Sequence, residues 1–445
     1  YIEVDKVLPF FGFNENNLLQ DPKNRAKYDL PPRSIYPSQD DHISEDGGWV
    51  NLDVTLSGQE DQELLMPGKL VRSWQEDGRY HASYRSKGLV RPRFAVAAGA
   101  YETRTAQADG VTVTAYYSKG QDGVVDALLQ GAVDTLRYGS RVLVPYDDDE
   151  LKIVAIPSFA DRVAGTAYRN TIFEVENRVY QLEPEKGGNF NAYRGMAHEV
   201  GHQWWGHTVH PANAEGHSMI AEMLAVYTET VMSDEVYGME RRMEELKRRR
   251  DLYFYIRSFE EDMERPMYEV HYQPYIYYFK GAHVAYVLSQ LMGRERVDQV
   301  LGQFAKTYRY PARPTADKLS KALISAAPEQ YRDQVRELLE EVVTYNLRMI
   351  SAKGTKEGTV LVAMQADRII WDETGNATET AFTGPLELGF YKKGELIGSQ
   401  MIDLKTGASQ HEVFPPQGTD QVGLDPQMLR LDDDSDNNRI SVTAL

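Results

Sequence analysis

His198, Glu199 and His202 form an H-E-x-x-H pattern, the strongest chemical signal in the sequence, within a helix-compatible stretch that spans 194–205. Residues four apart on an α-helix differ in direction by only about 40°, so the two imidazoles can face one metal ion while Glu199 points toward a water on that ion. With ten His among 445 residues, the pattern arises by chance in about one such chain in fifty. It therefore predicts a catalytic metal site with Glu199 as general base and acid.

A catalytic zinc ion takes three protein ligands and leaves one position open for water. Because the sequence contains no Cys, the third ligand must be another His or a carboxylate. Glu222 is our candidate, since it lies in an apolar helical run where a lone carboxylate is costly to bury. Glu215 and Glu229 are rivals, although Glu229 better suits a hydrogen-bond acceptor behind a ligand imidazole. We therefore expect one Zn²⁺ on His198, His202 and Glu222.

Residues 198–206, H-E-V-G-H-Q-W-W-G, with a helical Glu downstream, resemble the gluzincin zinc peptidases. The Trp-Trp-Gly ending is similar to the aminopeptidase N and leukotriene hydrolase family, and 278–281, Tyr-Phe-Lys-Gly, is similar to its Tyr-Glu-Lys-Gly stretch. The resemblance covers 120–350 best and implies a mainly helical, thermolysin-like zinc domain that hydrolyses peptides. It also implies that the hydroxyl of Tyr278 donates a hydrogen bond to the oxyanion of the tetrahedral intermediate.

More loosely, Leu8-Pro9 and the segments 27–33 and 207–227 resemble the peptidase-like part of bacterial proteins that fuse a permease to such a domain. This resemblance implies a larger membrane-associated protein, with this part on the extracytoplasmic face of the membrane or in the periplasm. The sequence itself contains no run of 18 or more apolar residues. The alternative function is an inactive peptidase fold that serves a membrane transporter as a binding or regulatory module.

The sequence departs from the family pattern where a Gly-Ala-Met-Glu-Asn motif should supply a carboxylate for the substrate α-amine. Residues 165–170 read Gly-Thr-Ala-Tyr-Arg-Asn instead, so that Arg169 stands in place of the carboxylate. A cation there would repel an ammonium group, which disfavours aminopeptidase action but leaves zinc hydrolysis intact. The substrate-binding candidates in this region are Arg169, Asn170 and Glu176.

The periodicity of apolar residues divides the chain into a multidomain α+β protein. An irregular lead-in and strands with alternating apolar residues, such as Val111, Val113 and Ala115, predict an N-terminal β domain over 1–119. Apolar positions three and four apart between Asp122 and Ser140 predict an amphipathic helix that opens a mainly α catalytic domain, 120–350. The small polar segment 351–358 predicts a linker, and strand-like runs over 359–445 predict a small β sandwich.

Charge excludes one class of partner. The 49 basic and 67 acidic side chains give a formal charge of −18, which repels phosphate backbones, so we expect a peptide substrate and no nucleic acid. Three His residues, 207, 210 and 217, do not repeat the helical pair and are typical of loop or surface positions. Two acidic runs, 147–150 and 432–437, are typical of solvated turns, and the second lacks the Gly and the closing Glu of a calcium loop.

Overall fold

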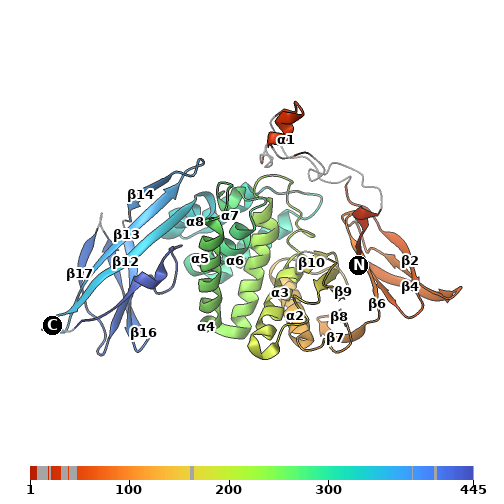
Figure 1. Cartoon of the computed structure of the whole chain (residues 1–445), viewed down its shortest axis with the longest axis horizontal. Coiled ribbons are helices and arrows are strands. Elements are labelled where there is room, and N and C mark those ends of the chain that lie inside the picture. Colours follow the sequence, from red (N-terminus) through yellow and green to blue (C-terminus); the bar gives the residue numbers. More distant parts are fainter. Residues whose placement is uncertain are drawn as a thin grey trace. The chain divides into compact units, whose positions relative to one another are not determined.

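A computed structural model describes residues 1–7, 19, 22–31, 39, 48–160, 165–382, 384–404 and 408–443. The chain divides into two compact units, and Figure 1 colours its elements in sequence order. The first unit consists of Tyr1–Glu245, Tyr268–Tyr272 and Leu288–Glu329, and the second of Leu246–Met267, Gln273–Val287 and Gln330–Leu445. The fold is mixed α+β, with β sheets at the N-terminal end of the sequence, helices in the middle and β sheets again at the C-terminal end.

The N-terminal part of the first unit contains two small sheets. One has the strand order β1-β6-β3 and the other β2-β5-β4. Leu64, Met66, Ala82 and Tyr84 are among the buried residues of the core that these strands share. The elements are β1 (Ile2–Glu3), η1 (Val4–Lys6), α1 (Pro22–Lys27), β2 (Asp53–Gln59), β3 (Glu63–Leu65), β4 (Lys69–Glu76), β5 (Arg79–Arg85) and β6 (Ala95–Gly99).

The sheet beneath the site has five strands in the order β10-β11-β9-β8-β7. Its three central strands are parallel, and every residue of β9 after Glu150 is buried, as expected for a strand covered on both faces. The sheet is built from β7 (Glu102–Ala108), β8 (Val111–Tyr117), β9 (Glu150–Ile156), β10 (Gly165–Tyr168) and β11 (Thr171–Val175). The alternation at Val111 to Ala115 thus marks a strand, but that strand pairs with β9 and not with the N-terminal sheets. An alternation with a period of two shows which face of a strand is buried, but it does not show which strands pair with it. The sequence pattern alone therefore grouped β8 with the N-terminal sheets.

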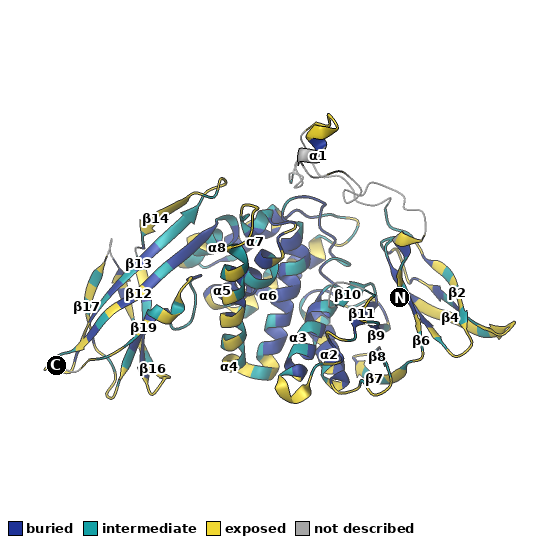
Figure 2. Ribbon diagram, in the orientation of Figure 1, coloured by how far each residue is buried: buried dark blue, intermediate teal, exposed yellow. Residues whose placement is uncertain are grey.

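Helices pack against this sheet, and buried residues line their inner faces (Figure 2). The helix expected between 122 and 140 is α2 (Val125–Val142). A Cβ at Gly131 would lie 2.6 Å from the carbonyl oxygen of Tyr193 in α3 (Gly188–Gly201), so α2 and α3 pack closely because Gly131 has no side chain. Four more helices lie entirely in this unit: η3 (Pro184–Lys186), η4 (Met219–Met223), α6 (Arg294–Thr307) and α7 (Ala316–Ala326). Three others are shared with the second unit, and this unit contains the first part of α4 (Leu224–Arg257), most of η5 (Met267–Glu269) and the end of α5 (Gly281–Met292).

The second unit contains the predicted β sandwich. One sheet contains β12-β13-β14 with β17 on β13, the other has the order β16-β15-β18-β19, and apolar residues of both form one core. The segment 351–358 is no linker, because 351–354 complete β12 and the next residues turn into β13. The elements are η6 (Tyr275–Lys280), η7 (Glu329–Tyr331), α8 (Arg332–Glu340), β12 (Val343–Gly354), β13 (Val360–Trp371), β14 (Ala377–Ala381), β15 (Gly384–Lys392), β16 (Glu395–Leu404), β17 (Ser409–Val413), β18 (Gln421–Leu424), η8 (Ser435–Asn438) and β19 (Arg439–Ser441).

Candidate active site

The H-E-x-x-H residues lie at the C-terminal end of α3. The helix ends at Gly201, and His202 caps it while keeping a helical backbone conformation. The helix therefore begins before the stretch 194–205 and ends four residues before that stretch does, and the helical conformation of His202 still brings its imidazole to the same side as that of His198. Trp204 follows in a turn and Trp205 in a β-bridge with Val209, and both are fully buried in the core, where they support the end of the helix.

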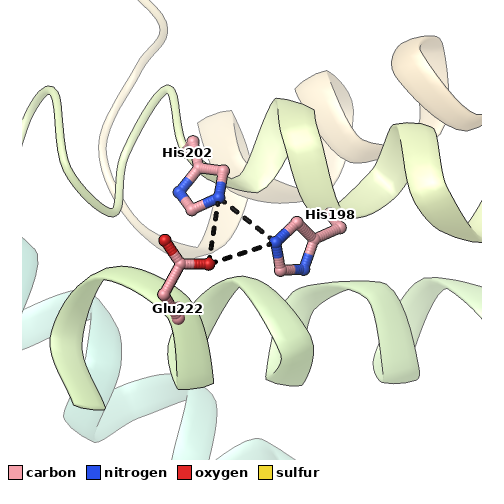
Figure 3. A group of neighbouring side chains, drawn as sticks. All are labelled: His198, His202 and Glu222. Carbon is pink, nitrogen blue, oxygen red and sulfur yellow. Dashed lines mark hydrogen bonds and ion pairs between the residues drawn. The ribbon is translucent and has the colours of Figure 1, made fainter. Parts of the chain in front are cut away.

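The side chains of His198, His202 and Glu222 converge on one point (Figure 3). The two Nε2 atoms are 3.2 Å apart, and Glu222 Oε2 lies 3.5 Å from Nε2 of His198 and 3.7 Å from Nε2 of His202. Ligand atoms that share a tetrahedral zinc ion are separated by about 3.4 Å. The three atoms thus have the chemistry and the spacing of a zinc ligand set, and no other group of three such side chains occurs among the described residues.

The third ligand sits on an irregular piece of helix. Glu222 belongs to η4, a π-helical turn that runs directly into α4. Such turns widen the helix locally and are common at functional sites. The turn follows Gly216, which has a φ of +79° that suits glycine, and a Cβ added there would lie only 2.1 Å from the Tyr268 carbonyl oxygen. A tight glycine turn therefore sets where η4 begins.

Both imidazoles have an acceptor behind them. Nδ1 of His198 lies 3.4 Å from Glu229 Oε2, and Nδ1 of His202 lies 2.9 Å from the carbonyl oxygen of Trp205. Each acceptor favours the tautomer with its proton on Nδ1, which leaves the Nε2 lone pair for a metal. Glu229 also accepts a hydrogen bond from Arg194 at 3.1 Å.

The charges around His198 favour a cation. Burial by itself lowers the pKa of His198, but contacts with Glu222 and Glu229 outweigh burial and raise the pKa to about 10. The pKa of Glu199 is also raised, chiefly by burial, although the two imidazoles oppose the shift. A raised carboxyl pKa brings Glu199 closer to the range in which a general base works best near neutral pH.

Glu174 is a residue beside the site that the sequence did not predict, an acid in the otherwise uncharged and fully buried strand β11. It is 2% exposed, and burial raises its pKa well above the usual range, helped by the nearby Glu199 carboxylate. Gly165 is its partner on β10, and a Cβ there would lie 2.7 Å from Glu174 Oε2 and 2.9 Å from Glu199 Oε1. The sequence signal that could have found it was a charged residue among four buried strand neighbours.

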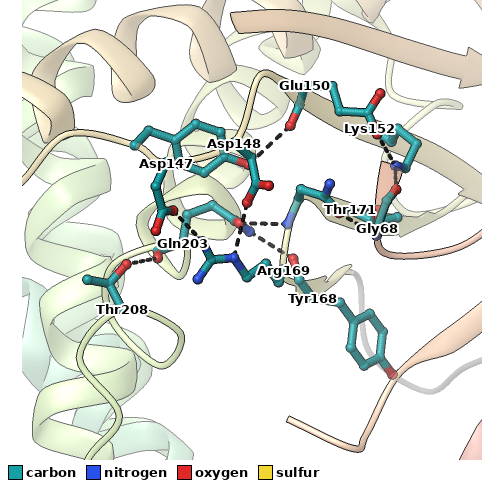
Figure 4. A network of polar contacts seen from close by, with 12 residues as sticks. Gly68, Asp147, Asp148, Glu150, Lys152, Tyr168, Arg169, Thr171, Gln203 and Thr208 are labelled. Atoms are coloured by element: carbon teal, nitrogen blue, oxygen red, sulfur yellow. Dashed lines mark hydrogen bonds and ion pairs between the residues drawn. The ribbon is translucent and has the colours of Figure 1, made fainter. Parts of the chain in front are cut away.

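The three substrate-binding candidates each have other contacts, and Figure 4 shows those of Arg169. The guanidinium of Arg169 donates to Asp148 Oδ2 at 3.0 Å and also to Asp147. Asn170, with φ +50°, is buried and accepts a hydrogen bond from the backbone of Gly68. Glu176 accepts a hydrogen bond from the hydroxyl of Ser118.

The acidic run 147–150 is therefore not simply a solvated turn. Asp148 is 8% exposed and pairs with Arg169, because a buried guanidinium needs a carboxylate beside it. In the run 432–437, Asp432 is likewise buried and accepts hydrogen bonds from Leu347 N and Asn438 Nδ2. His207 and His210 lie in a loop, the first half-buried and the second buried, and a ring nitrogen of each lies within hydrogen-bond distance of a backbone carbonyl oxygen.

Tyr278 lies in the second unit, on the π-helical turn η6. Arg249 donates to the Tyr278 carbonyl oxygen at 3.1 Å, and Lys280 at the end of the turn donates to buried Glu264 at 2.7 Å. These contacts hold the turn, while the role of the Tyr278 hydroxyl stays a prediction. No helix among the described residues is long and apolar enough to cross a membrane.

Comparisons with known proteins find a family model that is similar to part of this chain. Residues 129–341 match the family model described as Peptidase family M1 domain. Among solved structures, the chain is similar to aminopeptidase A of Legionella pneumophila in complex with aspartic acid, with a TM-score of 0.60 and 13% identity. The match covers 86% of this chain and 44% of that one, so this chain spans less than half of the neighbour. No curated protein matches. Part of this chain is thus similar to the peptidase M1 domain, and its fold resembles that of the Legionella enzyme.

Proposed function

We propose that this peptidase M1 domain is a zinc-dependent metallopeptidase of the gluzincin type that hydrolyses peptide bonds. The convergence of His198 Nε2, His202 Nε2 and Glu222 Oε2 within 3.7 Å of one another carries the proposal. A zinc ion held by these atoms would polarise the scissile carbonyl and lower the pKa of a water from about 15.7 to about 7.

Three further side chains have roles in the proposed reaction. The Glu199 carboxylate takes a proton from the water and passes it to the nitrogen of the leaving amine. Glu229 accepts the Nδ1 proton of His198, which fixes the tautomer of that imidazole and leaves its Nε2 directed at the site. On the family resemblance, Tyr278 donates its hydroxyl proton to the developing oxyanion, where a prepositioned hydrogen bond contributes most.

The test is a comparison of carboxylate variants in zinc-loaded protein. Glu199→Gln should keep stoichiometric zinc and lower kcat by about 10²- to 10⁴-fold on a peptide library, because it loses the proton acceptor. Glu222→Gln should lose zinc, whereas Glu215→Gln, which removes the rival ligand in the preceding loop, should keep it. If Glu199→Gln stays within a few fold of the wild type, the assigned general base is wrong.

The alternative function is a non-catalytic module that keeps the metal site. Stoichiometric zinc in the wild-type protein together with no cleavage of any library peptide would favour it. Membrane association through a fused permease, on the extracytoplasmic side, is a further proposal from the sequence resemblance and could be tested by identifying the full-length parent protein and its location.

A further inference from the structure

Gln203, the residue that follows the candidate ligand His202, binds two backbone groups of the β10–β11 hairpin, and Figure 4 shows it beside Tyr168. Its side-chain Oε1 accepts a hydrogen bond from Asn170 N at 2.9 Å, and its Nε2 donates one to the Tyr168 carbonyl oxygen at 2.9 Å. Tyr168 is the last residue of β10, and Asn170 directly precedes β11. Gln203 is only 3% exposed, so water cannot readily replace either bond if it is lost.

The loop that contains Gln203 is fixed to the end of α3. Gln203 N donates a hydrogen bond to the Val200 carbonyl oxygen of α3 at 2.9 Å. His207 in the same loop adds a contact to β10, because its Nε2 lies 3.2 Å from the Ala167 carbonyl oxygen. The tip of the hairpin is therefore held to the end of the helix that carries the candidate ligands.

The other end of β10 lies against the proposed general base. Every residue of β10 pairs with β11, so the hairpin can shift only as a unit. A Cβ added to Gly165, at the start of β10, would lie 2.9 Å from Glu199 Oε1 and 3.0 Å from Glu199 Cδ. Only a residue without a side chain lets the strand lie this close to the carboxylate. A shift of the hairpin therefore changes the packing of the Glu199 side chain.

We propose that Gln203 is a positioning residue, which holds the β10–β11 hairpin to α3 and thereby sets where Gly165 lies against the Glu199 carboxylate. A general base must be aimed at the proton that it takes, and a displacement of about 1 Å can cost a large part of the rate. This inference rests on the proposed function, because that function gives Glu199 its role. The hydrogen bonds of Gln203 to the hairpin do not depend on it.

Hydrogen exchange measures whether Gln203 holds the hairpin. Gln203→Met keeps the length of the side chain but offers neither the acceptor oxygen nor the amide donor. The Asn170 amide should then exchange at least about tenfold faster by NMR, because its acceptor is gone. Tyr84→Phe is the control, since it removes another buried hydrogen bond of this unit, to the Leu64 carbonyl oxygen, and should leave that rate unchanged. The same Asn170 exchange rate in Gln203→Met and the wild type would overturn the proposal.

A double-mutant cycle measures whether the effect reaches Glu199. The probe is acetohydroxamate, which binds zinc through two oxygens and can give its acidic proton to a neighbouring carboxylate. By calorimetry on zinc-loaded protein, Gln203→Met should weaken its binding at least about threefold in the wild type and less than about twofold in Glu199→Gln, where no carboxylate is left to position. Unchanged affinity in the wild type, or an equal loss in both backgrounds, would overturn the proposal.

Hydrolysis gives the same comparison in the proposed reaction. Gln203→Met should lower kcat about tenfold and keep KM and zinc affinity within about twofold, because the metal ligands remain in place. Tyr84→Phe should change none of these quantities, and an unchanged kcat in Gln203→Met would contradict the positioning role.

If Gln203→Met does not fold, Gln203→Asn replaces it in all three measurements, because a side chain one methylene shorter cannot reach both backbone groups. A wild type that cleaves no library peptide would refute the proposed peptidase function. The exchange and acetohydroxamate measurements would still decide the role of Gln203.

Discussion

Glu229 connects a candidate zinc ligand to the rest of the protein. It accepts from Nδ1 of His198 and from Arg194 while only 3% exposed. Acceptors in this position fix the orientation of the ligand imidazole and raise its basicity. We therefore expect the replacement of Glu229 to change zinc affinity more than it changes the free energy of unfolding.

Replacing Glu229 by Gln removes the charged acceptor and keeps the size of the side chain. We expect zinc affinity to fall about 10- to 100-fold, measured by competition with a chelator. Glu245→Gln removes the other carboxylate near Arg194, at 3.8 Å, and leaves the His198 contact in place. Equal zinc affinity in the two variants would contradict the role given to Glu229.

His283 in the second unit makes stability depend on pH. It is 2% exposed, and burial, helped by Arg250, Lys280 and Arg430, lowers its pKa to about 3. The unfolded chain, with an ordinary pKa of 6.5, binds more protons than the folded chain between these values, so this contribution to stability falls as the pH drops through that window.

The expected loss from His283 between pH 7 and pH 5 is up to about 2 kcal/mol of unfolding free energy. His283→Gln cannot take up the proton, so its urea unfolding curves should show a correspondingly smaller loss over the same pH range than the wild type. Parallel losses in the two proteins would mean that His283 is protonated equally in both states.

At the level of elements, the turn at Gly216 determines where the π-helical turn with Glu222 begins. A Cβ at this position would lie 2.1 Å from the carbonyl oxygen of Tyr268 and 2.3 Å from Ala316 Cβ. Neither neighbour can yield easily, because one is backbone and the other is a short side chain in α7. The loop must move if the glycine is replaced.

Gly216→Ala should destabilise the protein by the roughly 1–2 kcal/mol that a left-handed backbone costs an alanine, plus the cost of relieving the contact, and should lower zinc affinity through displacement of Glu222. The control is Gly110→Ala in the β7–β8 turn, where φ is +93° and an added Cβ would meet no atom within 4 Å. Chemical denaturation and zinc competition on both variants check this. Similar zinc affinities would show that η4 does not depend on the turn.

The sequence predicts those parts of the site that follow from local geometry. The spacing of His198 and His202 is a property of one helical turn, and Glu222 is recognisable as an acid in an apolar run. The sequence did not single out Glu174, because a single acid in a short strand has many ordinary explanations. Its place next to Glu199 is visible only in the folded structure, where β10 and α3 lie beside it. The pairing of Arg169 with Asp147 and Asp148 likewise depends on two loops that meet only in the folded sheet.

At the scale of the whole molecule, strand periodicity gave the element types but not the partners of each strand. The expected boundary near 119 separates β8 from β9, although the two are hydrogen-bonded neighbours in one sheet. Similarly, the expected boundary at 350 falls within β12. The four-part division by sequence stays a prediction, but these two boundaries cut through continuous structure.

A fragment of residues 120–350 should therefore fail to fold. It lacks β7 and β8, so β9 would expose an edge whose residues are buried in the intact sheet. A chain of residues 48–443 keeps this sheet and both sheets of the sandwich, and should give a cooperative thermal transition. Soluble yield and circular dichroism on both pieces test this, and a folded, zinc-binding 120–350 fragment would contradict it.

The path of the backbone has a consequence for how such a protein can evolve. The chain passes between the two units after residues 245, 267, 272, 287 and 329, and α4 and α5 each contribute to both. A genetic exchange with a single breakpoint cannot replace one unit without splitting the other. The sandwich strands all follow residue 342, so an exchange of the sandwich alone would separate it from the parts of α4 and α5 that belong to the same unit.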